Sequence, residues 1–174
     1  EVTCTPLAGK PGASVLIGGL GMGFTLRRAL AILGKDAKVT VAELVPGIIQ
    51  WARGPLTPVF QGCLDDPRAD VIQADVGKVI AGAKASYDAI LLDVDNGPEG
   101  LSRPGNDRLY GAAGLAAAKA ALKPRGVLDG WSAHPDEAFT KRMKQAGFAV
   151  EEVKARAHGK RGGSRHLIWL GRKG

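Results

Sequence analysis

Short apolar runs alternate with longer alanine- and leucine-rich segments along most of this chain of 174 residues. Such alternation predicts strand–helix units, in which parallel strands form one sheet and helices cover both of its faces. The apolar runs are nearly continuous, which is typical of strands that are buried on both sides. Five of these strands are expected, at residues 14–17, 38–42, 69–73, 87–92 and 126–131.

Helices are expected between and after these strands, at residues 23–33, 46–53, 76–83, 110–122 and 135–146. Residues 148–155 and 166–171 then follow as two strands with no helix between them. Adjacent strands joined by a polar loop form a hairpin, so the last strand has to run antiparallel to its neighbour. The predicted fold class is therefore α/β, a doubly wound Rossmann-like sheet of seven strands with the last one antiparallel.

A chain of this length supports one hydrophobic core, so we expect a single domain. Residues 13–174 are assigned to it, and residues 1–12 are interpreted as a lead-in that ends an upstream segment, because the chain begins with Glu1. No apolar run reaches eighteen residues, and the first one is too short for a signal peptide, which predicts a cytoplasmic protein. Cys4 and Cys63 lack metal-ligand spacing and are expected to be unpaired thiols.

The formal net charge of +7 is compatible with an acidic partner. Much of the basic excess, however, lies in residues 154–173 rather than along a helix face with interleaved aromatic residues. A solvated loop explains this distribution, and we do not expect a nucleic acid partner. The expected partner is a small molecule, and a homodimer stays an open alternative.

The strongest local signal is a buried strand that runs directly into a glycine-rich turn and then a helix. Gly19, Gly21 and Gly23 form a G-x-G-x-G pattern, which allows positive φ angles and a close approach of the backbone to a ligand. The dinucleotide fingerprint needs a third small residue at the position where this chain has Phe24. The loop therefore favours a nucleoside ligand other than NAD.

Acidic residues end the second, third and fourth predicted strands at the same edge of the sheet as this loop. Glu43 can accept hydrogen bonds from both hydroxyls of a ribose, or be a solvated strand end. Asp75 can contact the ligand or cap the helix that begins at Val76. Asp93 can face a sulfonium or an amine, because a carboxylate at a buried strand end needs a positive or hydrogen-bonding partner; alternatively it orders the following loop.

Together these segments resemble the spermidine synthase family of polyamine aminopropyltransferases, which has the class I S-adenosylmethionine-dependent methyltransferase-like fold. The resemblance implies that an aminopropyl group moves from decarboxylated S-adenosylmethionine to an amine such as putrescine. It also implies that Asp93 is the catalytic aspartate, which helps to deprotonate and hold the attacking amine, and that Glu43 is the ribose ligand and Asp75 the adenine ligand. The residues that carry it are 15–30, 39–46, 75, 87–98 and 122–128.

The chain departs from the family pattern at two motifs. The glycine motif of the family is usually G-G-G-D-G, with an aspartate that helps to hold the aminopropyl end of the donor, whereas residues 18–23 contain no acid. From the position of Asp93 onward, the family motif is roughly D-S-x-D-P-x-G-P. The corresponding stretch here is shorter, and Asp95 would take the role of the second aspartate of that motif. The family's β-rich N-terminal domain is not among these residues.

The candidate site residues follow from these arguments. Asp93 is the predicted catalytic residue, and Asp95 and Tyr110 are predicted substrate contacts. His134, His158 and His166 are weaker candidates without ligand partners at metal spacing, and no metal is expected. The residues predicted to bind the donor nucleoside are Gly18, Gly19, Gly21, Gly23, Glu43, Asp75, Val76 and Asp93.

Three functions remain open at this point. The favoured one is an aminopropyltransferase that uses decarboxylated S-adenosylmethionine as co-substrate. The second is an S-adenosylmethionine-dependent methyltransferase, which uses the same pocket and is favoured by the missing acid in the glycine loop. The third is a non-catalytic nucleoside-binding or dimerisation module, against which the three acids count together.

Overall fold

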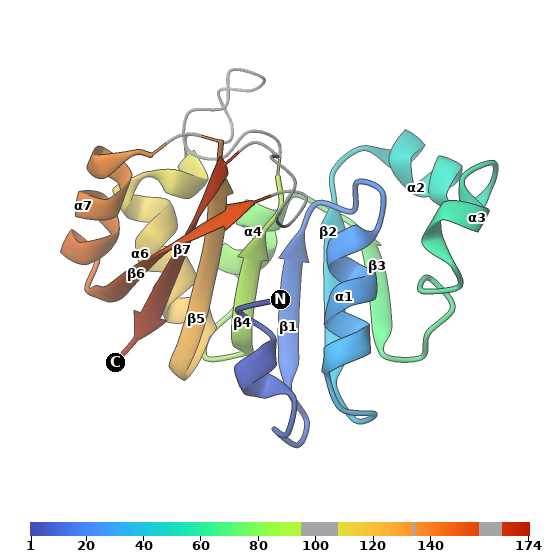
Figure 1. Ribbon diagram of the computed structural model, residues 1–174, viewed down its shortest axis with the longest axis horizontal. Coiled ribbons are helices and arrows are strands. Elements are labelled where there is room, and N and C mark those ends of the chain that lie inside the picture. Colours follow the sequence, from blue (N-terminus) through green and yellow to red (C-terminus); the bar gives the residue numbers. More distant parts are fainter. Residues whose placement is uncertain (95–107, 134, 157–164) are drawn as a thin grey trace.

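The chain forms a single twisted sheet with helices on both faces (Figure 1). The computed structural model describes residues 1–94, 108–133, 135–156 and 165–174. The strands are β1 (Ser14–Gly18), β2 (Lys38–Glu43), β3 (Ala69–Gln73), β4 (Tyr87–Leu92), β5 (Leu122–Ser132), β6 (Phe148–Arg156) and β7 (Arg165–Lys173). The helices are η1 (Thr5–Leu7), α1 (Phe24–Ile32), α2 (Pro46–Arg53), α3 (Thr57–Phe60), α4 (Val76–Ala81), α6 (Ala112–Ala121) and α7 (Glu137–Gln145).

The strand order is β3-β2-β1-β4-β5-β7-β6. Strands β1 to β5 are parallel, and β7 pairs antiparallel with both β5 and β6. The predicted fold class, including the antiparallel last strand, is confirmed. The order reverses between β1 and β4, and ligands of open α/β sheets bind outside the carboxyl ends of the strands at such a point.

Two elements differ from the sequence prediction. Helix α3 occupies part of a proline-rich stretch for which the sequence analysis predicts no helix, and Pro58 lies in its first turn, where a missing N–H costs nothing. Strand β5 begins at Leu122, four residues before the predicted start at 126, because Leu122 already pairs with Tyr87 of β4. The ladder is then irregular and resumes where Val127 pairs with Ala89. Arg125 has a φ angle of +62° at this irregularity.

Alternating residues of the strands feed two separate cores. On one face Val15 and Ile17 of β1 pack with α1, α2 and α3, and on the other face Leu16 packs with α4, α6 and α7. This separation explains why the strands are apolar at nearly every position. Trp169 is fully buried in the second core, whereas Trp51 on α2 is 61% exposed and does not belong to a core.

The N-terminal residues pack against the sheet. Thr3 and Cys4 are buried, and both predicted thiols, Cys4 and Cys63, are free and buried.

Asp88, at the other end of β4 from the candidate site, has a buried carboxylate that pairs with Lys10 at 2.6 Å and Lys123 at 2.8 Å. Burial raises the pKa of Asp88, but the hydrogen bonds from these lysines and from the Ser14 amide outweigh it and hold the pKa below its usual range.

In the part of the chain that the structure describes, the helices are too short or too polar to cross a membrane.

Candidate active site

The ends of four parallel strands are tied together at one edge of the sheet. The Gly19 amide donates to the Ala42 carbonyl, and the Asp93 amide donates to the Gly18 carbonyl, both at 2.9 Å. The Ala74 amide donates to the Glu43 carbonyl at the same distance. The residues that follow β1, β2, β3 and β4 therefore occupy adjacent positions, which is what the sequence prediction required.

The glycine loop has the backbone conformation that its composition predicts. Gly19, Gly21 and Gly23 have φ angles of +92°, +48° and +73°, in the region that side chains disfavour. At Gly19 a Cβ atom would lie 2.4 Å from the carbonyl oxygen of Asp93, so the loop after β1 and the loop after β4 approach each other closely. A side chain at Gly21 would meet nothing within 4 Å.

Two of the predicted glycines support the pocket without lining it. A Cβ atom at Gly18 would lie 2.9 Å from Val76, and one at Gly23 would lie 2.5 Å from the ring of Phe60. Gly18 thus lets α4 approach β1, and Gly23 lets α3 approach the start of α1. The third position of the dinucleotide fingerprint, Phe24, is 64% exposed, and the Arg27 guanidinium lies 4.9 Å from its ring centre.

Glu43 is buried, which excludes the interpretation as a solvated strand end. Its Oε2 accepts a hydrogen bond from the Leu20 amide at 2.9 Å, and its Oε1 accepts one from the Val45 amide at 2.8 Å. The carboxylate therefore joins the glycine loop to the start of α2. Each carboxylate oxygen has a second lone pair, so Glu43 keeps acceptor capacity for a ligand in the pocket.

Asp75 caps helix α4, as one of the two interpretations from the sequence proposed. Its Oδ1 accepts from the amides of Gly77 at 2.7 Å and Lys78 at 3.2 Å. The side chain is exposed at the pocket wall, and within the described residues the second oxygen, Oδ2, takes no part in this cap. Capping and ligand binding are compatible here because they use different oxygens.

Asp93 is exposed just beyond the end of β4. Its Oδ2 accepts a hydrogen bond of 2.6 Å from the hydroxyl of Thr25, in the first turn of α1. Sequence reasoning missed Thr25, although a hydroxyl residue at the start of the helix after a glycine loop is a recognisable signal. The side chain of Asp93 is thereby turned toward α1.

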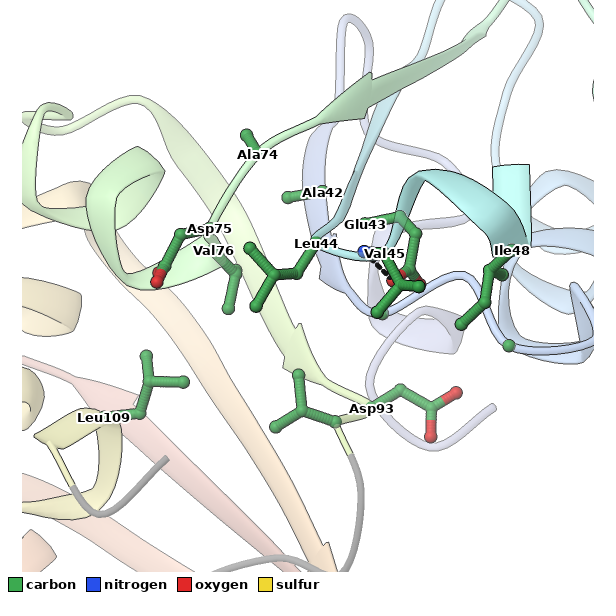
Figure 2. A pocket seen from close by; sticks show the side chains of 13 residues that line it. Ala42, Glu43, Leu44, Val45, Ile48, Ala74, Asp75, Val76, Asp93 and Leu109 are labelled. Atoms are coloured by element: carbon green, nitrogen blue, oxygen red, sulfur yellow. Dashed lines mark hydrogen bonds between the residues drawn. The ribbon is translucent and has the colours of Figure 1, made fainter. Parts of the chain in front are cut away.

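These residues surround one pocket at the switch point of the sheet. Figure 2 shows Glu43 and Asp75 on separate sides of it, with the apolar side chains of Leu44 and Val76 drawn between them. The lining combines six of the predicted residues with apolar ones that sequence reasoning did not single out. The full set is Gly19, Gly21, Ala42, Glu43, Leu44, Val45, Ile48, Ala74, Asp75, Val76, Asp93, Val94 and Leu109.

Tyr110 packs in the second core rather than over the pocket. It is 2% exposed, and its ring meets Phe139 edge-on at 5.5 Å. Burial raises the pKa of its hydroxyl, and the charges of Asp93 and Asp129 raise it further. The Tyr110 hydroxyl is therefore close enough to Asp93 to respond to its charge. A contact between Tyr110 and the substrate stays a prediction.

Four further candidates were predicted from the sequence: Asp95, His134, His158 and His166. Asp95, His134 and His158 fall outside the described residues. His166 is at the start of β7, where its ring packs edge-on against Trp131 at 5.5 Å.

Asp129, which sequence reasoning did not consider, is a second acid near Asp93. It lies on β5 opposite Leu91 of β4 and accepts a hydrogen bond from the Thr3 hydroxyl. Burial raises the pKa of Asp129 to about 6; Thr3 opposes the rise and the negative charge of Asp93 adds to it. The only sequence signal was an acid within residues 126–131, which carry no other charge.

Comparison with known proteins shows which sequences this chain resembles. Polyamine aminopropyltransferase 1 from Streptomyces coelicolor is 34% identical over 155 residues, which is 84% of this chain. The polyamine aminopropyltransferase from Mycobacterium tuberculosis is 32% identical over 154 residues, or 83% of this chain. The resemblance to the polyamine aminopropyltransferases is confirmed. The chain spans 28% of the length of each of these two relatives, and no protein-family model matches it.

Solved structures confirm the fold. Spermidine synthase from Thermotoga maritima superposes with a TM-score of 0.74 at 22% identity, over 98% of this chain and 56% of that one. A spermidine synthase in complex with the transition-state analogue AdoDATO gives a TM-score of 0.75 with the same identity and coverage. Human methyltransferase-like protein 13 in complex with SAH gives 0.70, over 99% of this chain and 76% of that one.

Replacing Asp129 with asparagine is expected to stabilise the protein at neutral pH. An acid whose pKa in the folded protein lies above its unfolded value of about 3.9 destabilises the folded protein once it ionises. This destabilisation grows from about pH 4 to pH 6 and reaches its maximum above that range. We expect Asp129→Asn to gain about 1–2 kcal/mol at pH 7.5 and almost nothing at pH 4, because water still reaches part of this residue.

Urea unfolding at both pH values measures this difference. Asp70→Asn, at an exposed acid on β3, is the control and should change the free energy of unfolding little at either pH. A loss of stability on Asp129→Asn at pH 7.5 would contradict the prediction.

Proposed function

We propose that this domain is an aminopropyltransferase that transfers an aminopropyl group from a decarboxylated S-adenosylmethionine donor to an amine. The observation that carries the proposal is the arrangement of Glu43, Asp75 and Asp93 around one pocket beside the glycine loop. A non-catalytic module needs no exposed acid at Asp93 next to a nucleoside pocket. The similarity to polyamine aminopropyltransferases over most of this chain supports the same reaction.

The pocket suits the nucleoside part of such a donor. The buried carboxylate of Glu43 is proposed to accept hydrogen bonds from the ribose hydroxyls, in addition to those from the Leu20 and Val45 amides. The Oδ2 atom of Asp75 is proposed to accept from the adenine amino group while Oδ1 caps α4. Apolar side chains such as Ile48 and Leu109 would contact the flat base.

The chemical step requires little beyond alignment and an unprotonated amine. The nitrogen lone pair of the acceptor attacks the carbon next to the sulfonium, a C–N bond forms, and the C–S bond breaks. Its electron pair goes to sulfur, which leaves as the neutral thioether of methylthioadenosine. The amine then loses a proton, and we assign Asp93 to hold the amine and take up that proton.

Methyl transfer from intact S-adenosylmethionine is the second candidate, and the glycine loop is the observation that favours it. Residues 18–23 carry no acidic side chain to hold an aminopropyl ammonium. The Gly21 and Met22 amides lie in the turn before α1, where a helix N-terminus favours anions such as the donor carboxylate. The Leu20 amide does not contribute, because it already donates to Glu43.

Removing the carboxylate of Glu43 should weaken nucleoside binding. We expect Glu43→Ala to lose about 1.5–3 kcal/mol of affinity for methylthioadenosine, the range for hydrogen bonds to a charged group. The glycine loop also loses its tie to α2, so circular dichroism should check folding first. Calorimetric titration measures the affinity, with Asp70→Ala as the exposed acid control; unchanged affinity in Glu43→Ala would overturn the ribose assignment.

Replacing Asp93 with asparagine should affect turnover more than donor binding. The amide keeps an acceptor for Thr25 but cannot take up a proton, so turnover should fall by about 10²–10⁴, the usual contribution of a positioned acid or base. Methylthioadenosine affinity should stay within about threefold, which is about 0.65 kcal/mol. Steady-state kinetics with a panel of diamines tests this, and normal turnover would show that Asp93 is not the catalytic base.

The choice of donor can be decided by side-by-side calorimetric titration with intact and decarboxylated S-adenosylmethionine. We expect the intact form to bind at least as tightly, because the glycine loop offers amides and no negative charge. A preference of tenfold or more for the decarboxylated donor, about 1.4 kcal/mol, would show that another acid such as Asp95 replaces the missing one. Product analysis with each donor then distinguishes aminopropyl from methyl transfer.

A further inference from the structure

The carboxylate of Asp93 needs an external restraint to hold one orientation. Asp93 lies just past the last residue of β4, and its side chain is exposed rather than packed. An exposed aspartate that is free to rotate does not present one defined oxygen to a substrate. Within the described residues, the side-chain hydrogen bond recorded for Asp93 is the one from Thr25, at 2.6 Å from Oγ1 to Oδ2.

Thr25 lies on a helix that packs firmly against the sheet. It lies in the first turn of α1, and Leu26, Ala29 and Leu30 of this helix are buried in the first core. The helix is entered through Gly23, whose amide donates to the Leu20 carbonyl at 2.8 Å. The Leu20 amide in turn donates to Glu43. The nucleoside pocket and the Thr25 hydroxyl therefore belong to one connected piece of structure.

A second acid on the same side of the sheet makes this restraint more important. Asp129 pairs with Leu91 in the β4–β5 ladder, and Leu91 packs in the first core together with α1. The negative charge of Asp93 raises the pKa of Asp129, so the two carboxylates repel each other when both are ionised. Each of them accepts a hydrogen bond from a threonine on a different covering segment, Thr3 for Asp129 and Thr25 for Asp93.

We propose that Thr25 is a positioning residue: its hydroxyl fixes Oδ2 of Asp93 against α1, so that Oδ1 faces the acceptor amine. This inference rests on the proposed function, in which Asp93 holds that amine. The hydroxyl has one proton to give and donates it to the carboxylate, and Thr25 takes no part in bond making. Because α1 begins directly after the glycine loop, Thr25 relates the position of the acid to that of the donor.

Two substitutions at Thr25 separate positioning from packing. Thr25→Val keeps the shape and removes the hydroxyl, and we expect kcat to fall by about 10- to 100-fold, the effect of misplacing a catalytic group by about 1 Å. Methylthioadenosine affinity should stay within about twofold, because Thr25 does not line the pocket. Thr25→Ser restores the hydroxyl and should recover kcat to within about threefold of the wild type.

The matched control is Thr57→Val. Thr57 begins α3 and its hydroxyl donates to the backbone carbonyls of Ala52 and Gly54, so its loss should leave kcat unchanged. An unchanged kcat in Thr25→Val would overturn the proposal. So would an equal loss of methylthioadenosine affinity, or a failure of Thr25→Ser to recover activity, since both indicate a general distortion of α1.

A double-mutant cycle on thermal unfolding tests the contact without any activity. Thr25→Val should lower the unfolding temperature in the wild-type background and change it less in an Asp93→Ala background, where the acceptor is already gone. Equal shifts in both backgrounds would overturn the contact. If the wild type transfers no group to any amine while the cycle shows coupling, the proposed function fails but the Thr25–Asp93 link is retained.

Discussion

The buried carboxylate of Glu43 organises the candidate site. Its two oxygens accept the amides of Leu20 and Val45, so one side chain joins the glycine loop after β1 to the start of α2 after β2. A buried carboxylate is costly unless it is hydrogen-bonded, and here the backbone supplies both partners. The shape of the pocket therefore depends on the same group that is proposed to recognise the ribose.

The other two acids combine a structural contact with a proposed binding role in different ways. Asp75 uses one oxygen to cap α4, a role that any N-cap aspartate has. Asp93 lies just beyond the end of β4 and accepts a hydrogen bond from Thr25, on a helix far away in the sequence. The close approach of Gly19 to the Asp93 carbonyl brings these two loops together. The pocket is thus formed by contacts between segments rather than by one motif.

The glycine loop is where the resemblance to the aminopropyltransferases and the local chemistry disagree. The similarity extends over 84% of this chain, but residues 18–23 lack the acid that the family uses at the aminopropyl end of its donor. The structure removes one of the three loop amides from the argument for an anionic donor group, because Glu43 already occupies the Leu20 amide. The expected preference for the intact donor over the decarboxylated one consequently rests on the amides of Gly21 and Met22.

The sequence by itself determined the seven-stranded architecture, the antiparallel last strand and the three acids at strand ends, because strand periodicity and chain direction place those ends at one edge. Positive φ angles at Gly19, Gly21 and Gly23 were equally predictable from composition. Local pattern did not reveal helix α3, whose prolines also suit a loop.

Only the tertiary structure decided which groups touch. The Thr25 hydroxyl on Asp93 joins residues 68 positions apart, and Thr3 on Asp129 joins residues 126 apart. It also decided that Tyr110 packs against Phe139 and that Gly18 and Gly23 make room for Val76 and Phe60. Periodicity specifies which face a residue occupies, whereas such contacts depend on how the helices pack across the sheet.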